Sequence, residues 1–514
     1  MILVNVSLAK PPAPTSPPSI TPQRLFIDGA FVDAAEGATF ETFNPATNEV
    51  IASVAAATAS DVADAVAAER RAFADGPWPR LPATRRASVL RGIAELIRAN
   101  AEELVALECL DIGMPISQMH GLAARAADNF DYFAGVITEL AGHSYRVGDE
   151  FLNYTIHKPV GVAGLIMPWN APLMLSTWRI APCLAAGNTI VLKPAEWAPL
   201  TATRLAEIIA ESDLPAGVFN VVHGFGETAG AALSADPDVD LIAFTGETST
   251  GRLIMAAGAP TLKRVSMELG GKSPVLVFDD ADLPRAIDAA LAQIFTMNGQ
   301  RCTAGSRLIV EHTIYDQVLE AVAARAANVR TGDPFDPATE LGPLINAEHH
   351  ARVCAYIESA ERDGARVLAG GARPPELEQG NFLQATVIGD VREDMKVFQE
   401  EIFGPVLVAT PFVGDDDALR LANATPYGLA AYVWTRDITR AHRLAQAIDS
   451  GMCWINAPNV RDLRTPFGGV KDSGIGREGG AYSFDFYCDL QTVQVALAEQ
   501  AIPRFGLAGA GGDD

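Results

Sequence analysis

Short apolar runs alternate with amphipathic helical patterns along most of the chain. The first patterns predict helices over residues 60–73, 82–109 and 116–140, with Ser60 capping the first and Pro82 in the first turn of the second. Apolar runs rich in Val and Ile then occur at residues 162–167, 189–192, 218–222 and 241–244, with a helical pattern between each pair. Buried strands separated by helices indicate a parallel sheet covered on both faces.

A second series of the same kind begins after Gly270. It consists of predicted strands at residues 274–278 and 307–310 and predicted helices at residues 282–297 and 314–329. Two shorter signals lie outside both series. An Asp-Gly pair within residues 25–33 predicts a hairpin, and residues 151–159 have a strand-like pattern. The expected fold class is therefore α/β, with two parallel-sheet domains and a small β unit.

Composition and charge exclude several classes of function. The chain of 514 residues has a net charge of −24, which argues against nucleic-acid binding because phosphate recognition needs a basic surface. No apolar run reaches the roughly 18 residues of a membrane helix, so we expect no membrane span. The six cysteines are scattered without C-x-x-C spacing, which favours a reduced, cytoplasmic protein. Residues 1–22, which lack the pattern of a secretory signal, and residues 501–514 are expected to be disordered tails.

Three polar residues are candidates for catalysis. Cys302 lies in a glycine-containing segment beside Arg301 and Arg307, whose charges would favour the reactive thiolate. Glu268 ends an apolar strand before a Gly-Gly turn, where burial would raise its pKa and make it a general base. Asn170 follows another strand and could donate to an oxyanion. Alternatively, the cysteine is inert, the glutamate is solvated and the asparagine belongs to a turn.

Polar residues at other predicted strand ends are typical of dinucleotide binding. Lys193 and Glu196 follow one strand, where a carboxylate can bind ribose hydroxyls. Gly246 and Gly251 join another strand to a helix and would let backbone amides approach a pyrophosphate. Neither this segment nor residues 224–230 matches G-x-G-x-x-G, so each could also be a simple turn.

Together these segments resemble the aldehyde dehydrogenase family over roughly residues 25–490. The stretches 267–271, 299–302, 401–405 and 466–471 look like its motifs, in the family's order. The resemblance implies NAD-dependent oxidation of an aldehyde to an acid, with Cys302 as nucleophile, Glu268 as base and Asn170 as oxyanion donor. It also implies a set of cofactor-binding residues, with Glu196 favouring NAD over NADP. They are Ile166, Trp169, Lys193, Glu196, Gly226, Gly230, Thr245, Gly246, Glu247, Gly251, Leu269, Glu401 and Phe403.

The resemblance also implies a division of the chain. Residues 23–140 and 160–270 would form the NAD-binding domain, and residues 271–480 the catalytic domain. Residues 141–159 and 481–500 would form a small β arm that bridges subunits, which implies a homodimer or homotetramer.

Two positions depart from the family pattern. Arg179 stands where many relatives have lysine, and because arginine stays charged, a proton relay through this position is in doubt. Glu247 stands where many relatives have serine near the pyrophosphate.

The segment Asn459-Val-Arg-Asp-Leu-Arg464 resembles family members that act on hydroxymuconic-type semialdehydes from aromatic-acid breakdown. Such substrates carry carboxylates, so Arg461 and Arg464 are candidate binding groups, beside Trp178 and Phe467 as tunnel walls. Alternatively, these arginines pair with Asp462 and the aromatic residues belong to the core.

Three other functions stay open from the sequence. One is a broad-specificity enzyme for neutral aldehydes. A CoA-acylating enzyme would not need Glu268, and a non-catalytic binding protein would usually lose Cys302. Adjacent histidines at 349 and 350 point in different directions on a helix, so we expect no metal site.

Overall fold

The computed structural model describes residues 18, 20–503 and 505–506, so most of both expected tails lies outside the described residues. Strands up to residue 268, together with β19 from much later in the chain, build an eight-stranded sheet in the order β19-β11-β10-β7-β8-β9-β1-β2. Its five central strands are parallel, and β1, β2 and β19 are antiparallel at the edges. The strands are β1 (Leu25–Ile27), β2 (Ala30–Val32), β7 (Val162–Ile166), β8 (Thr189–Lys193), β9 (Phe219–Val221), β10 (Leu241–Thr245), β11 (Arg264–Glu268) and β19 (Gly474–Ile475).

Helices cover both faces of this sheet because alternate strand residues are apolar on each side. In β7, Ala163 and Leu165 join one buried cluster, whereas Val162 and Ile166 join another. The first cluster packs against α2 (Ala83–Ala99), α3 (Ala101–Ile112), α4 (Ile116–Glu139), α5 (Pro172–Ala186) and α6 (Leu200–Ala210). The second packs against α1 (Ala59–Ala74), α7 (Ala231–Ala235) and α8 (Thr248–Gly258).

A seven-stranded sheet follows, in the order β14-β15-β16-β13-β12-β17-β18, parallel except for β14. Its strands are β12 (Pro274–Val277), β13 (Arg307–Glu311), β14 (Arg366–Ala369), β15 (Thr386–Gly389), β16 (Val406–Phe412), β17 (Ala430–Trp434) and β18 (Met452–Ile455). Its helices are α9 (Leu283–Phe295), α10 (Tyr315–Ala326), α11 (Ala347–Arg362), α12 (Lys396–Gln399), α13 (Gly414–Asn423) and α14 (Ile438–Ala447). The predicted α/β class with two sheets is confirmed.

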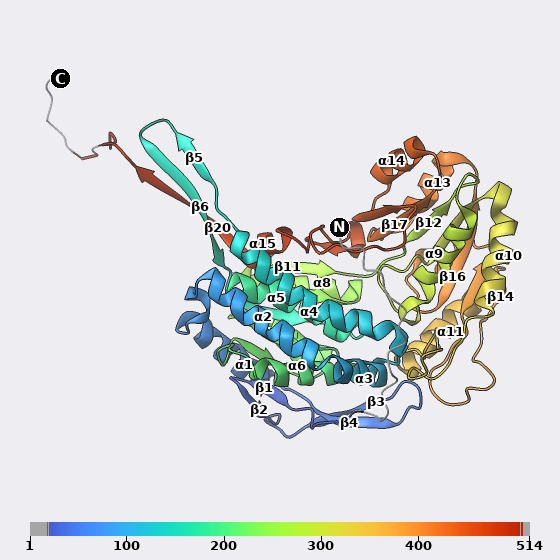
Figure 1. Ribbon diagram of the computed structural model, residues 1–514, viewed down its shortest axis with the longest axis horizontal. Coiled ribbons are helices and arrows are strands. Elements are labelled where there is room, and N and C mark those ends of the chain that lie inside the picture. Colours follow the sequence, from blue (N-terminus) through green and yellow to red (C-terminus); the bar gives the residue numbers. More distant parts are fainter. Residues whose placement is uncertain (1–17, 19, 504, 507–514) are drawn as a thin grey trace.

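A third, antiparallel sheet projects from the body as an arm (Figure 1). It contains β5 (Ser144–Val147), β6 (Phe151–Pro159) and β20 (Cys488–Ala496), with β6 in the centre. The helix α15 (Tyr482–Tyr487) leads into β20, and a separate hairpin pairs β3 (Thr39–Phe43) with β4 (Val50–Ala55). Tyr145, Val147 and Leu490 are exposed apolar residues on this arm.

Local structure differs from the sequence prediction at two helix ends. The cap of α1 is Thr58 rather than Ser60, and Thr58 exchanges hydrogen bonds with Asp61 in a capping box. The predicted helix over residues 82–109 is two helices, because the chain leaves helical geometry at Asn100. Within the described residues, no helix is long and apolar enough to span a membrane.

Candidate active site

Glu268 is the last residue of β11 and lies at the carboxyl edge of the first sheet. Its side chain is buried, and neither carboxylate oxygen has a hydrogen-bond partner among the residues that the structure describes. Burial raises the pKa of Glu268 to about 7, although the charges of Arg179, Arg477 and Arg461 oppose this rise. An unpartnered carboxyl group with this pKa can accept a proton near neutral pH.

Cys302 lies in the loop between α9 and β13. The loop begins with Met297, Asn298 and Gly299 in left-handed conformations, at φ of 58°, 56° and 71°. The Asn298 side-chain amide holds this turn by donating to the carbonyls of Gly113 and Pro343, both at 3.0 Å. The loop places Cys302 in the lining of a cavity together with Glu268, at the end of β11, and Glu401, in the segment before β16.

The thiol of Cys302 is more weakly acidic than we expected. Burial, with the nearby charges of Glu268 and Glu401, raises its pKa to about 12. Arg301 lowers the pKa only in part. Arg307 instead donates to the carbonyls of Lys272, Leu421 and Ala422, each at 2.8 Å. Arg301 therefore favours the thiolate as expected, whereas the same expectation for Arg307 was wrong.

Asn170 lies in the turn between β7 and α5. Its side chain is buried, and Nδ2 donates to the Gln300 carbonyl at 2.9 Å, two residues before Cys302. This bond uses one of the two N–H groups on Nδ2, so the other remains for a ligand. The three predicted catalytic side chains thus come together from different elements.

A cavity of about 150 Å³ contains these three residues. Its lining also includes seven of the predicted cofactor-binding residues. They are Trp169, Thr245, Gly246, Glu247, Leu269, Glu401 and Phe403. Trp197, His349 and Arg352 line it as well and were not predicted from the sequence. No short motif marks these three, since they reach the cavity only through the fold.

Glu401 and Phe403 are held in the lining of this cavity by contacts that involve backbone groups. Glu401 Oε1 accepts a hydrogen bond from the Gly271 amide at 2.8 Å, and burial raises the pKa of Glu401 to about 7. Phe403 has a φ of 61° and packs edge-on against Trp169 at 5.4 Å. His349 Nε2 lies 2.7 Å from the Phe403 carbonyl. The histidine at 349 therefore supports the aromatic wall.

The remaining cofactor candidates lie along the carboxyl edge of the first sheet. Ile166 ends β7, and Lys193 ends β8 and forms a 2.9 Å ion pair with Glu196. Gly226 and Gly230 bound one helical turn after β9 and have open space where a side chain would begin. A Cβ at Gly251 would lie 2.8 Å from Leu269 Cδ2, so the Leu269 side chain would have to shift to make room for it.

The two departures from the family pattern have local partners. Arg179 is 1% exposed, pairs with Glu478 and donates to Ser266 Oγ at 2.8 Å. Burial lowers the pKa of its guanidinium. The Glu247 carboxylate lies 3.7 Å from Arg352, so its negative charge at the mouth of the cavity is partly offset.

The predicted substrate residues Trp178, Arg461 and Phe467 do not line this cavity but contact one another, with the guanidinium of Arg461 between the two aromatic rings. It lies 4.8 Å from the ring centre of Trp178 and 4.3 Å from that of Phe467. A second guanidinium, that of Arg125, lies 5.6 Å from the Trp178 ring. Neither arginine forms an ion pair with a residue that the structure describes. Arg125 was not predicted, because nothing in the pattern of helix α4 distinguishes it.

Arg464 does not join this cluster. Its side chain is exposed and binds both carboxylate oxygens of Asp462. The alternative interpretation of a loop arginine paired with Asp462 therefore describes Arg464 but not Arg461.

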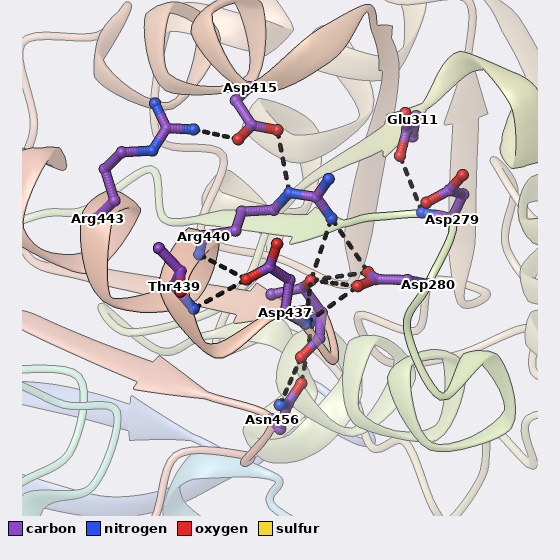
Figure 2. Close-up of polar contacts among 10 residues, drawn as sticks. Asp279, Asp280, Glu311, Asp415, Asp437, Thr439, Arg440, Arg443 and Asn456 are labelled. Atoms are coloured by element: carbon purple, nitrogen blue, oxygen red, sulfur yellow. Dashed lines mark hydrogen bonds and ion pairs between the residues drawn. The ribbon is translucent and has the colours of Figure 1, made fainter.

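A polar network fixes the start of the loop that carries Arg461. Asn456 has a φ of 51°, and its side-chain amide donates to the Thr435 carbonyl at 2.7 Å and accepts from the Thr435 amide at 3.1 Å. The Thr435 hydroxyl donates to Asp280, which also lies 3.3 Å from Arg440 (Figure 2). These contacts fix the backbone at the point where the loop leaves β18.

The chain belongs to the aldehyde dehydrogenase family, whose model matches residues 31–493. The predicted family and enzyme class are thereby confirmed. The chain is 50% identical over 450 residues to 5-carboxymethyl-2-hydroxymuconate semialdehyde dehydrogenase of Escherichia coli, covering 86% of this chain and 95% of that protein. It is 44% identical to 2-hydroxymuconic semialdehyde dehydrogenase of Pseudomonas sp. strain CF600, covering 92% and 99%.

Solved structures show the same fold. HpcC from Thermus thermophilus superposes with a TM-score of 0.93 at 52% identity, covering 95% of both chains. The NAD+ complex of aldehyde dehydrogenase from Bacillus cereus has a TM-score of 0.91 at 44% identity, covering 93% of this chain and 97% of that one. The expected cofactor, NAD, is thus the one that this relative holds.

Proposed function

We propose that the protein oxidises a carboxylate-bearing, hydroxymuconic-type semialdehyde to the corresponding acid, with NAD as hydride acceptor. The observation that carries the substrate class is the Arg461 guanidinium, held between Trp178 and Phe467 without a carboxylate partner among the described residues. Two relatives with this type of substrate in their names, at 50% and 44% identity, support the same class.

The residues at the carboxyl edge of the first sheet fit a dinucleotide. Lys193 and Glu196 offer a cation and a carboxylate for ribose hydroxyls, and Glu401 offers a second carboxylate near Cys302. The amides at the start of α8 have no side-chain cap, which suits an anionic pyrophosphate. When bound, NAD supplies the acceptor for the hydride that leaves the former aldehyde carbon.

The acylation half of the reaction belongs to Cys302 and Asn170. The Cys302 sulfur bonds to the aldehyde carbon while its proton passes to a base, a role that we assign to Glu268. The carbonyl electron pair moves to oxygen, and the Asn170 amide and the Cys302 N–H stabilise that charge. Loss of one such donor typically costs about 10²–10³ in rate. Departure of hydride leaves a thioester on Cys302.

The deacylation half belongs to Glu268. After the proton taken from Cys302 has left it, the carboxylate takes a proton from water, whose oxygen bonds to the thioester carbon. The C–S bond then breaks, the acid leaves, and the proton passes from Glu268 to the Cys302 sulfur. Arg179 cannot carry the first proton away, because arginine stays protonated even when buried. We therefore assign proton release to water in the cleft, with Arg179 and Glu478 as a fixed ion pair behind Glu268.

The substrate proposal is tested by kcat/KM with NAD across a panel of aldehydes. The panel contains acetaldehyde, benzaldehyde, succinic semialdehyde and enzymatically generated 5-carboxymethyl-2-hydroxymuconate semialdehyde. We expect the last to be preferred by about 10² or more, which corresponds to about 2.7 kcal/mol of transition-state binding. A flat panel would favour a broad-specificity enzyme and overturn the substrate class, while leaving the family's activity intact.

A matched pair of variants assigns the preference to one arginine. Arg461→Met should lower kcat/KM for the dicarboxylic semialdehyde by about 10², with less than about threefold change for benzaldehyde. Arg464→Met, in the same loop but exposed and paired with Asp462, should change neither. Equal losses for both aldehydes in Arg461→Met would mean that the residue supports the loop and does not bind a carboxylate.

We also propose which parts of the chain bind NAD, which part carries the nucleophile and which parts join subunits. Residues 23–140 and 160–270 would bind NAD, residues 271–480 would carry the nucleophile, and residues 141–159 and 481–500 would join subunits into a dimer or tetramer. The exposed apolar residues on both outer strands of the arm support the last assignment. Six free cysteines support a reducing compartment such as the cytoplasm.

A further inference from the structure

A buried carboxyl group lies behind the turn that carries Asn170. It belongs to Glu108 of α3, whose side chain is 1% exposed. The Glu108 Oε1 atom accepts a hydrogen bond from the backbone N–H of Leu173 at 2.7 Å. Leu173 lies in the first turn of α5, three residues after Asn170. A residue distant in sequence thus contacts the segment that presents the amide.

The sequence of α5 explains why this helix needs an external acceptor. Its N-cap residue is Ala171, which has no side-chain acceptor, and Pro172 at the first position has no N–H. Leu173 therefore has the first free N–H of the helix, and in a buried site an unpaired N–H is costly. Glu108 supplies the missing cap from another helix.

Asn170 is held from two sides. Its Nδ2 atom donates to the Gln300 carbonyl at 2.9 Å, which ties it to the nucleophile loop. The backbone that follows it is tied to α3 through Leu173 and Glu108. A movement of the α5 end would shift the Asn170 amide relative to Cys302, and an oxyanion donor tolerates about 0.5 Å of displacement.

A neighbouring acid makes an equivalent contact without any link to the oxyanion site. Asp111, one turn further along α3, accepts from the backbone N–H of Leu200 at 2.9 Å and from the Thr42 hydroxyl at 3.3 Å. Leu200 begins α6, which carries none of the three catalytic side chains. Asp111 is therefore a control position: its substitution removes a buried helix cap without affecting α5.

We propose that Glu108 is a positioning residue for the oxyanion site. By capping the N-terminus of α5, it holds the Asn170 side chain at the place where negative charge develops on the aldehyde oxygen. This inference rests on the oxyanion role of Asn170 in the proposed function. It predicts that Glu108 acts on kcat through Asn170 and has no separate effect.

The test begins with three substitutions of Glu108 that differ in whether they present an oxygen acceptor to the backbone N–H of Leu173. Glu108→Gln keeps an oxygen acceptor and should retain kcat within about threefold. Glu108→Met keeps the volume but offers no oxygen, and should lower kcat about 10- to 100-fold with KM for the aldehyde within about threefold. Glu108→Asp retracts the oxygen by one methylene and should fall between them. Asp111→Asn should leave kcat within about twofold.

A double-mutant cycle with Asn170→Ala decides between positioning and general support. If Glu108 acts through Asn170, then Glu108→Met or Glu108→Asp should cost less than about threefold in kcat when Asn170 is already alanine. Full, multiplicative loss in that background would overturn the inference. NAD binding measured by protein fluorescence confirms folding of each variant, and the aspartate variant serves if the methionine variant does not fold.

The cycle also separates this inference from the proposed function. If Asn170→Ala alone turns over at the full rate, the oxyanion role itself fails. If Asn170→Ala is slow but the Glu108 effect is independent of it, only the positioning role fails.

Discussion

Glu268 lies within the electrostatic influence of three arginines, yet its pKa is raised. Desolvation is the largest contribution, and Arg179, Arg477 and Arg461 reduce the rise without reversing it. The oxygens of this side chain also have no donor among the described residues. A base that is held by no hydrogen bond is free to reach both a thiol and a water molecule, as the proposed mechanism requires.

The pKa of Glu268 predicts the acid limb of the pH profile. Because the base must be unprotonated and its pKa is about 7, kcat should fall about tenfold per pH unit below pH 7 and level off above it. Glu268→Gln should slow NADH formation in the first turnover as well as the steady rate, since the same carboxylate takes the proton of Cys302 and then that of water. Stopped-flow absorbance measures both. Steady turnover of the glutamine variant at the wild-type rate would contradict the assignment.

The sequence predicts side chains well where a motif is short and local. Cys302, Glu268 and Asn170 were each identified from a glycine turn or a strand end, and the fold brings them into one cavity. Arg125 and Glu108 were not predicted, because each lies on a helix whose pattern is ordinary and acts on a residue distant in sequence. The direction of the Arg307 side chain was also not predicted, since its partners are backbone carbonyls of Lys272 and of α13, both distant in sequence.

At the scale of elements, α3 buries two carboxyl groups, Glu108 and Asp111, against the ends of two other helices. Burial raises the pKa of Glu108 to about 7 and that of Asp111 to about 8. In each case the hydrogen bonds to backbone amides lower the pKa, but by less than burial raises it. Both groups therefore bind a proton more tightly in the folded protein than in the unfolded chain.

This protonation predicts how stability depends on pH. A carboxyl group with a raised folded pKa stabilises fully below its unfolded pKa of about 4, and this contribution is lost as pH rises toward the folded value. For Asp111 the loss is up to about 1.4 kcal/mol per pH unit, ending near pH 8. Asp111→Asn removes the titration, so its Tm relative to wild type should be higher at pH 8 than at pH 5.

Scanning calorimetry at a fixed protein concentration measures this difference. Asp64→Asn, on the exposed face of α1, serves as the control and should show the same Tm difference at both pH values. An Asp111→Asn difference that does not change with pH would show that Asp111 titrates normally in the folded protein.

Elements were predicted where hydrophobic periodicity is strong. The buried strands β7, β8, β10 and β12 and the helix α4 match their predicted ranges closely. The break at Asn100 was not predicted, because residues 82–109 keep an apolar periodicity through it and asparagine only weakly disfavours helix. The edge strand β19 was also missed, since two residues carry no periodic signal.

At the scale of the whole molecule, the arm joins distant parts of the chain. In the sequence, its central strand β6 comes between α4 and β7, whereas its strand β20 follows all strands of the second sheet. The arm extends away from both sheets (Figure 1), and its apolar residues Tyr145, Val147, Leu152 and Leu490 are exposed. A protruding sheet with such residues is typical of an interface between subunits.

Polar substitution on the arm tests this assembly. Leu152→Asp combined with Leu490→Asp should shift the molar mass, measured by light scattering after size exclusion, toward that of one subunit. Val413→Asp, which places the same charge at an exposed apolar position on the body, is the control and should not change the mass. An unchanged oligomer in the double variant would exclude these arm positions from the interface.

The raised pKa of the Cys302 thiol affects how readily the nucleophile is oxidised or alkylated. With its pKa raised to about 12, the thiol is very largely protonated at pH 7. Peroxides and alkylating electrophiles react with the thiolate, so a resting enzyme is largely spared the irreversible steps from sulfenic to sulfonic acid. Its nucleophile is thus protected by the same burial that makes it depend on a neighbouring base for activation.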